Sequence, residues 1–199
     1  GGYEGIMNVV PGRGPFVLMT AAKQADIKLS GRIKFEQSVE NVGILLRANA
    51  NGTDNTGYEI HFDIQHNELL IRRHAKEIKT LAKRGLRPSF GWHNFRAELA
   101  KGELRFWLGD NKEPILTAKD ESPIEGEGHI GIRAWGGAVR TDGLKLHLAK
   151  HDVLVNEINP TLSIDGQLIA QTQAGLIKRR ALQDLCSVMF NISEFVYID

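Results

Sequence analysis

Hydrophobic and polar residues alternate along most of residues 1–150, which is the pattern of β-strands with one buried face. In the segment GYEIHFDIQ (57–65), apolar side chains occupy every second position, and Glu59, His61 and Asp63 lie between them. Successive side chains of a strand point to opposite faces. We therefore predict that one face of this strand lies in the core and that the other carries two carboxylates and an imidazole in a row.

The same alternation predicts a series of short strands separated by turn residues. The turns include the Asn- and Gly-rich loop 48–57 and the dipeptides His66-Asn67 and Lys101-Gly102, and no helical period is visible before residue 150. Many short strands of this kind are typical of an antiparallel β-sandwich or barrel, so we predict an all-β fold. The predicted strands are 16–20, 26–37, 42–48, 57–65, 68–74, 93–99, 103–109, 114–120, 129–135 and 143–148.

The pattern changes after residue 150. Residues 151–166 are predicted to be a connecting stretch, and Leu168–Phe195 has apolar residues at three- and four-residue spacing, which predicts an amphipathic helix. We therefore expect a β-sandwich over residues 1–150, followed by a linker and a helical segment over 151–199. The apolar side of that helix is a candidate surface for docking on a partner or on another domain.

Composition narrows the class of protein. The chain has 199 residues, which suits one domain, and 25 Lys and Arg against 24 Asp and Glu. Because the positive and negative charges nearly balance, the surface as a whole is not expected to attract a nucleic acid or an anionic membrane. No apolar run is long enough to span a membrane. The single cysteine, Cys186, excludes an intramolecular disulfide and a cysteine zinc site, and we expect it to be buried and inert.

Several segments resemble a known superfamily. They are NVGILLRA, TGYEIHFDI, NELLIRR, GWHNFRAELAKGELRFWLGDNKEPILTAKD and EGEGHIGIRAWGGAVRTDGLKLHL, and the resemblance extends over roughly residues 15–150. They resemble the concanavalin A-like lectin/glucanase superfamily and, within it, the laminin-G-like modules and the 3-keto-disaccharide hydrolases. The resemblance implies a jelly-roll β-sandwich. It does not choose a function, because the superfamily holds both binding modules and hydrolases.

The C-terminal segment Arg179–Asp199 carries a second, shorter resemblance. It is similar to the end of a domain of unknown function in large, secreted, cytochrome-associated proteins of planctomycete-type bacteria. The resemblance implies a secreted, periplasmic or cell-surface location, and Gly1-Gly2 is compatible with an earlier, removed targeting segment. The matching residues are Arg180, Ala181, Leu182, Asp184, Leu185, Cys186, Asn191, Glu194 and Phe195.

Alternation in three predicted strands suggests a carbohydrate-binding groove. Carboxylates accept hydrogen bonds from sugar hydroxyls, arginine donates to them, and the C–H face of a sugar ring packs on an aromatic side chain. Trp92, by contrast, is expected to pack in the core at a strand start. If the three strands are neighbours, the groove is lined by Arg47, Glu59, His61, Asp63, Arg133 and Trp135.

Other interpretations of these residues stay open. Cross-strand pairs of arginine with carboxylates are also ordinary on the solvent face of a sheet. The resemblance to the hydrolases would give Arg47, Glu59 and Asp63 a role in sugar cleavage. However, glucanases of the superfamily carry an E-x-D-x-(x)-E run, whereas this strand has E-x-H-x-D. Two carboxylates four residues apart on a strand are separated by about 13 Å, which exceeds the range for glycoside hydrolysis.

Two groups of residues carry side chains of the kind that bind metal ions. His61 and Asp63 lie on one face of a strand, but two ligands do not make a site, and we expect no metal there. The loop Asn49–Asn55 is a candidate calcium site, because Asn49, Asn51, Asp54 and Asn55 offer oxygen ligands.

Taken together, the predicted fold and groove lead us to predict a non-catalytic carbohydrate-binding or adhesion module of a secreted bacterial multidomain protein. A sugar hydrolase and a structural interaction domain are the alternatives.

Overall fold

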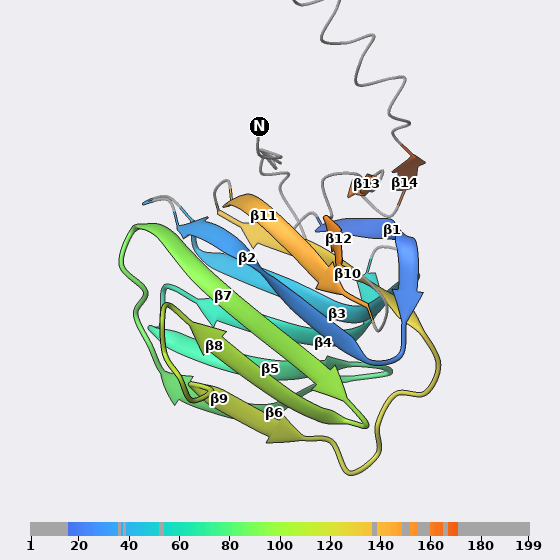
Figure 1. Cartoon of the computed structure of the whole chain (residues 1–199), viewed down its shortest axis with the longest axis horizontal. Coiled ribbons are helices and arrows are strands. Elements are labelled where there is room, and N and C mark those ends of the chain that lie inside the picture. The colour runs from blue at the N-terminus through green and yellow to red at the C-terminus, as the bar shows by residue number, and fades with distance from the viewer. Residues whose placement is uncertain are drawn as a thin grey trace, which may run out of the picture.

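The computed structural model describes residues 16–35, 37, 39–51, 54–136, 139–148, 152–154, 160–164 and 167–170. Within these residues every regular element is a β-strand, and the strands form two antiparallel sheets that lie one over the other (Figure 1). The larger sheet has the order β14 (Gln167–Ala170), β13 (Pro160–Ile164), β1 (Phe16–Gln24), β10 (Gly128–Trp135), β3 (Asn41–Asn51), β4 (Asp54–Asp63), β5 (Glu68–His74) and β6 (Ile78–Gly85). The smaller sheet has the order β12 (Asp152–Leu154), β11 (Val139–His147), β2 (Ile27–Phe35), β7 (Gly91–Ala100), β8 (Glu103–Leu108) and β9 (Leu116–Lys119). The predicted antiparallel β-sandwich is confirmed.

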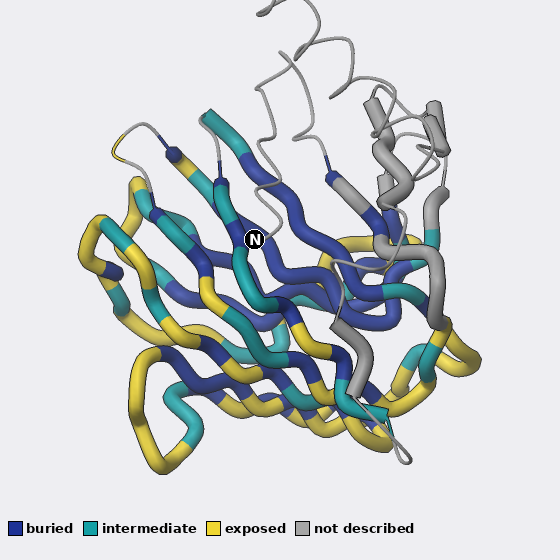
Figure 2. The backbone as a smooth tube through the Cα atoms, turned by 45° about the horizontal axis from the view of Figure 1, so that its top comes forward, coloured by how far each residue is buried: buried dark blue, intermediate teal, exposed yellow. Residues whose placement is uncertain are grey.

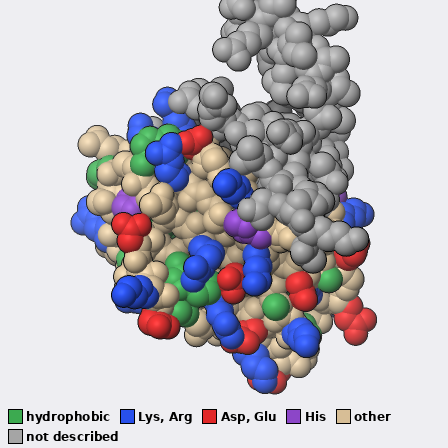
Figure 3. Space-filling model, viewed as in Figure 1, with side chains coloured by type: hydrophobic (Ala, Val, Ile, Leu, Met, Phe, Trp, Pro, Cys, Tyr) green, Lys and Arg blue, Asp and Glu red, His purple; other side chains and the backbone are tan. Residues whose placement is uncertain are grey.

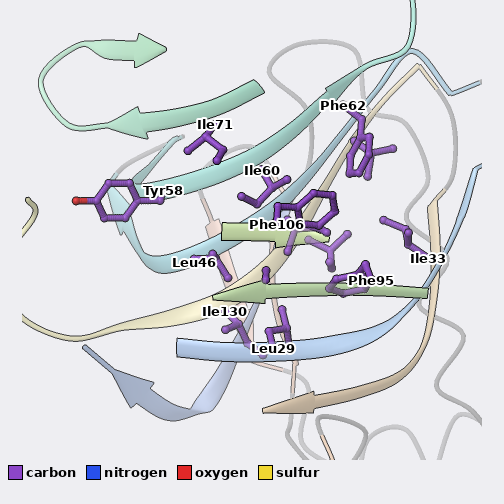
Figure 4. Close-up of a cluster of buried hydrophobic side chains, with 14 of the residues drawn as sticks. Leu29, Ile33, Leu46, Tyr58, Ile60, Phe62, Ile71, Phe95, Phe106 and Ile130 are labelled. Atoms are coloured by element: carbon purple, nitrogen blue, oxygen red, sulfur yellow. The ribbon is translucent and has the colours of Figure 1, made fainter. Parts of the chain in front are cut away.

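The core lies between the two sheets. On β4, the alternate residues Tyr58, Ile60 and Phe62 are fully buried and face the six-stranded sheet (Figure 4). The ring of Phe62 meets that of Phe106 on β8 edge to face, with centroids 5.6 Å apart. Dark-blue buried stretches run through both layers, and yellow exposed segments lie in the turns and alternate with buried ones along several strands (Figure 2). The core face predicted for β4 is therefore confirmed, and its other face is free to carry polar residues.

Three of the strands come from the segment beyond residue 150. β12 pairs with β11, and β13 pairs with both β1 and β14. The prediction of a plain connecting stretch over 151–166 is therefore wrong where β12 and β13 form. The predicted helix over 168–195 begins as strand β14, and its remainder lies outside the described residues. Where the structure describes the chain, no helix is long and apolar enough to cross a membrane.

Two further differences concern strands of the first 150 residues. The edge strand β6 was not predicted, because its sequence IKTLAKRG is mostly exposed and lacks a buried alternation. Exposed lysines and arginines are typical of an edge strand, since they oppose pairing with another chain. Trp92 was predicted in the core, but it lies on the outer face of β7 and is 40% exposed.

Candidate functional site

The three strands of the predicted groove are neighbours in the eight-stranded sheet, in the order β10–β3–β4. Gly43 in the middle strand pairs with Arg133 on one side and with His61 on the other. Asn41 in the same way pairs with both Trp135 and Asp63. The sheet therefore brings these side chains, together with Glu59, to its outer face, which is the face turned away from the core.

Glu59 is the centre of a buried polar cluster on this face. Its Oε1 lies 3.2 Å from Nδ1 of His61, and its Oε2 lies 2.7 Å from Nε2 of His74 on β5. A carboxylate only accepts hydrogen bonds, so both imidazole nitrogens carry a proton toward it. All three residues are less than 5% exposed. Such a cluster is unlike the solvated pairs of an ordinary sheet surface, because charged groups are rarely buried unless they are paired.

Gly43 makes room for the Glu59 carboxylate. A Cβ atom at Gly43 would lie 2.1 Å from Oε1 of Glu59, so any larger residue would displace the carboxylate. Burial by itself raises the pKa of Glu59, but the hydrogen bonds from His61 and His74 and the positive charge of Arg133 outweigh it. The pKa of Glu59 is consequently held far below its ordinary value, and the cluster contains a buried anion at neutral pH.

Arg133 connects the cluster to aromatic side chains. Its Nη2 donates a hydrogen bond of 2.7 Å to Oδ1 of Asn55. Its guanidinium group lies 5.1 Å from the ring centre of Phe16 on β1 and 5.5 Å from that of Trp135. These are cation–π distances. Trp135 is only partly buried and thus presents an aromatic surface beside a fixed cation.

Asp63 lies on the same face but is occupied by a local turn. Its Oδ1 accepts a hydrogen bond from the backbone N–H of His66, and its Oδ2 lies 2.8 Å from the imidazole Nδ1 of that residue. Burial raises the pKa of Asp63, but these bonds outweigh it and hold the pKa below its ordinary value. Asp63 therefore shapes the hairpin between β4 and β5 at the end of the cluster.

Arg47 does not belong to this face, and its placement corrects the prediction from simple alternation. A β-bulge interrupts β3 between Leu46 and Asn49, and Arg47 within it has φ = 51°. The Nε atom of Arg47 donates to the carbonyl of Ala25 at 2.8 Å, and Nη1 donates to that of Ile124. An extra residue in a strand reverses the order of faces beyond it. Arg47 consequently ties together two loops at the end of the sandwich.

An open groove continues the outer face beyond His61. His61 pairs with Leu70 on β5, and Leu70 pairs with Lys83 on the edge strand β6. The groove has a volume of about 550 Å³, and an ion pair of 3.1 Å joins Lys83 to Glu68 at one side. It offers hydroxyl, carboxylate and ammonium groups over an apolar floor. Its lining residues are Glu68, Leu70, Thr80, Leu81, Ala82 and Lys83.

His74 was missed from the sequence, although a signal for it exists. The tight turn at His66-Asn67 sets the register of the hairpin, and this register pairs Glu59 with Arg72 and Gly57 with His74. His74 is two residues beyond Arg72 on β5, so it lies diagonally opposite Glu59 on the same face of the sheet. Counting outward from the turn would have placed an imidazole beside the carboxylate.

The candidate calcium loop is already engaged in hydrogen bonds where its side chains are described. Nδ2 of Asn49 donates to the carbonyl of Glu127 at 3.1 Å, and Oδ1 of Asn55 accepts from Arg133. The side chains of Asn51 and Asp54 lie outside the described part, as do residues 52–53. Within that part, no group of three or more His, Cys, Asp or Glu side chains is arranged to hold a metal ion.

The fold of this chain is similar to solved structures, although its sequence matches no family model and no curated protein. The structure is similar to the carbohydrate-binding module CBM66 of Bacillus subtilis, with a TM-score of 0.58 and 13% identity over 73% of this chain and 92% of that one. It is also similar to the galectin LEC-6 of Caenorhabditis elegans, with a TM-score of 0.50 and 12% identity over 67% of this chain and 91% of that one. The fold is the concanavalin A-like jelly roll. At these identities the similarity establishes the fold alone and assigns no ligand to this chain.

Proposed function

We propose that this chain is a non-catalytic carbohydrate-binding module whose ligand lies on the outer face of the eight-stranded sheet. The observation that carries the proposal is the buried Glu59 cluster beside an open polar groove. A face with no ligand needs neither a buried carboxylate nor a pair of imidazoles held against it, because exposed polar residues satisfy a solvent face at lower cost. The two similar structures, a carbohydrate-binding module and a galectin, support the same class of ligand.

The arrangement suits a sugar in physical terms. The groove offers Glu68 as an acceptor, Lys83 as a donor and Thr80 as both, so it matches the mixed donor and acceptor character of sugar hydroxyls. Trp135 supplies an aromatic surface on the same face. We assign the Glu59 cluster a positioning role, because both oxygens of its carboxylate already accept from imidazoles.

The alternative of a sugar hydrolase has less support from the geometry. Hydrolysis by the usual mechanism needs two carboxylates about 5–10 Å apart, one of them free to donate a proton. Glu59 and Asp63 are four residues apart along β4, and each is engaged by histidines. The depressed pKa of Glu59 also disfavours a role as an acid at neutral pH. Cleavage of a bound glycan by the purified chain would restore the hydrolase proposal.

Occlusion of the groove is expected to weaken sugar binding strongly. Thr80 is exposed and lines the groove, so a tryptophan at this position would fill it without touching the buried cluster. We propose a glycan-array screen of the purified chain, with calcium and again with a chelator, followed by calorimetry of the best glycan. Thr80→Trp should weaken binding at least about tenfold, and Trp135→Ala should do so through the lost aromatic surface. A requirement for calcium would support a site in the loop 49–55.

Thr117→Trp is the matched control for this experiment. Thr117 is an exposed threonine of the edge strand β9 in the other sheet, so the same substitution there changes size and hydrophobicity away from the groove. It should bind the glycan as the unmodified chain does. Equal affinity of Thr80→Trp and Thr117→Trp would contradict the proposed location. An empty array under both conditions would contradict sugar binding and favour the interaction-domain alternative.

The wider setting of the module is part of the same proposal. We propose that it belongs to a secreted bacterial multidomain protein, on the basis of the resemblance of Arg179–Asp199 to a domain of such proteins. That segment and its proposed role in docking lie outside the described residues.

A further inference from the structure

The outer face of the six-stranded sheet is strongly basic, although the whole chain is nearly neutral with a net charge of +1. Blue side chains spread over the region of β2, β7 and β8 in the view onto this face (Figure 3). By strand alternation, eight cations and three acids point outward from the described strands β2, β7, β8, β9 and β11. We call this surface the basic face. Its cations are Lys28, Arg32, Lys34, Arg96, Arg105, Lys119, Arg140 and Lys145, and its acids are Glu98, Glu103 and Asp142.

An exposed aromatic side chain lies within the basic face. Trp92 is 40% exposed, and the guanidinium group of Arg32 lies 5.2 Å from its ring centre. Arg32 is also ion-paired with Asp142 on β11, so it is held from two sides. Phe90, two residues before Trp92, is 50% exposed. Phe90 and Trp92 thus give the basic face an exposed aromatic surface beside a fixed cation.

A second arginine of the basic face is held in the same manner. The guanidinium group of Arg96 lies 3.8 Å from the ring centre of Trp107, its cross-strand neighbour on β8. Trp107 is itself fixed, because it is only 7% exposed and its Nε1 donates to the carbonyl of Lys112. The Arg96 side chain nevertheless remains 49% exposed. The face thus offers guanidinium groups that lose little freedom when an anion binds them.

The spacing of the cations suits an extended polymer. On β2, the residues Lys28, Arg32 and Lys34 share the outer face and span about 20 Å along the strand. Arg96 lies on the adjacent strand, diagonal to Arg32, at roughly 7–8 Å. This row of positive charges is longer than one small anion. Its length matches a linear polymer that carries anionic groups at intervals.

We propose that the basic face is a second binding surface, which takes a linear polysaccharide bearing carboxylates. Trp92 would pack against the C–H face of a sugar ring, and Arg32 and Arg96 would pair with carboxylates. The acids Glu98 and Glu103 would repel the anionic groups of either polymer, but the backbone of DNA offers them no hydroxyl groups in return. For a sugar chain they are acceptors for hydroxyl groups. This surface is on the opposite sheet from the groove and is independent of the function proposed there.

The test uses one polymer in two charge states. Polygalacturonate and the same polymer with its carboxylates methyl-esterified are titrated against the full chain by calorimetry at low salt and at physiological salt. We expect the acid form to bind, added salt to weaken binding, and the ester to bind at least about tenfold more weakly. Trp92→Ala and Arg32→Gln should each weaken binding of the acid form about tenfold, with an unchanged melting temperature because both side chains are at the surface.

Lys79→Gln is the charge-matched control, since Lys79 is exposed on β6 of the other sheet. It removes one positive charge and should leave binding unchanged. The proposal is overturned if neither polymer binds, if both bind equally, or if Arg32→Gln binds as Lys79→Gln does. Tighter binding of a thymidine 20-mer than of polygalacturonate would replace the polysaccharide with a nucleic acid. Binding that is lost in Thr80→Trp but kept in Trp92→Ala would assign the polymer to the groove.

Discussion

Replacing Glu59 by glutamine is expected to lower the free energy of unfolding by about 3 kcal/mol at pH 7, because it removes the charge from a fully buried, paired carboxylate. Glutamine has nearly the same shape, so the loss would come from electrostatics and hydrogen bonding with only a small packing contribution. His61 and His74 would then face a neutral amide, and Arg133 would lose the anion that balances it. A stability loss of this size is large against the total stability of a domain.

The effect of Glu59→Gln should also depend on pH, with a sign that follows from the carboxylate. The pKa of Glu59 is depressed in the folded protein, relative to an ordinary value of 4.5. A group with a depressed pKa stabilises the folded state at pH values above its pKa in the unfolded chain. This contribution is lost as the pH falls below about 4.5 toward the folded-state pKa. The stability difference between the original chain and the variant should therefore be full at pH 7 and shrink at pH 3.

Urea denaturation at pH 7, 5 and 3 measures this difference directly. The matched control is Glu103→Gln, because Glu103 also accepts from an arginine but is half exposed. That variant should change the free energy of unfolding by less than about 0.5 kcal/mol at each pH. If Glu59→Gln were as stable as Glu103→Gln at pH 7, the buried cluster would contribute no more to stability than an exposed ion pair. That result would also contradict the positioning role that we propose for the cluster in the sugar site.

The parts of this site that alternation could predict are those on uninterrupted strands. Glu59 and His61 on β4 and Arg133 and Trp135 on β10 all lie on the predicted face, because neither strand is bulged at these positions. Their proximity was only an assumption, since sequence does not reveal that β10, far along the chain, pairs with β3. The two-sheet sandwich itself followed from the number of short strands and turns.

The errors have separate physical causes. Arg47 was misplaced because a bulge changes the face order, and the bulge needs the paired strands to be known. Asp63 lies on the predicted face, but its carboxylate is occupied by a hydrogen bond with the imidazole of His66, three residues further along the chain. The strands β12 and β13 were missed because residues 151–166 were predicted to be a connecting stretch, and β14 was missed because a helical spacing was favoured over residues 168–195. Trp92 was expected to pack in the core at a strand start, whereas it lies on the outer face and the guanidinium group of Arg32 lies 5.2 Å from its ring centre.

Replacing Gly128 by alanine is expected to destabilise the protein by about 3 kcal/mol, because the added methyl group would collide with backbone atoms. A Cβ atom at Gly128 would lie 2.4 Å from the carbonyl carbon of Arg47 and 2.8 Å from its Cα. Gly57, on the other side of the bulge, would bring a Cβ within 2.6 Å of the same residue's carbonyl oxygen. The bulge of β3 is therefore enclosed by two glycines on the neighbouring strands, and it cannot move aside without breaking the contacts of Arg47 with Ala25 and Ile124.

Thermal and urea unfolding of three variants test this requirement. Gly85→Ala is the matched control, because nothing lies within 4 Å of a Cβ built at Gly85. It should be neutral or should stabilise the chain by up to about 1 kcal/mol, since alanine restricts the unfolded state more than glycine does. Arg47→Met, which keeps the bulge but removes its hydrogen bonds, should be destabilised by about 2 kcal/mol through the unpaired carbonyl groups. If Gly128→Ala were as stable as Gly85→Ala, β3 and β10 would have to separate easily at this point. The bulge would then not be the rigid feature that directs Arg47 away from the outer face, and Arg47 would again be a candidate for the proposed sugar-binding face.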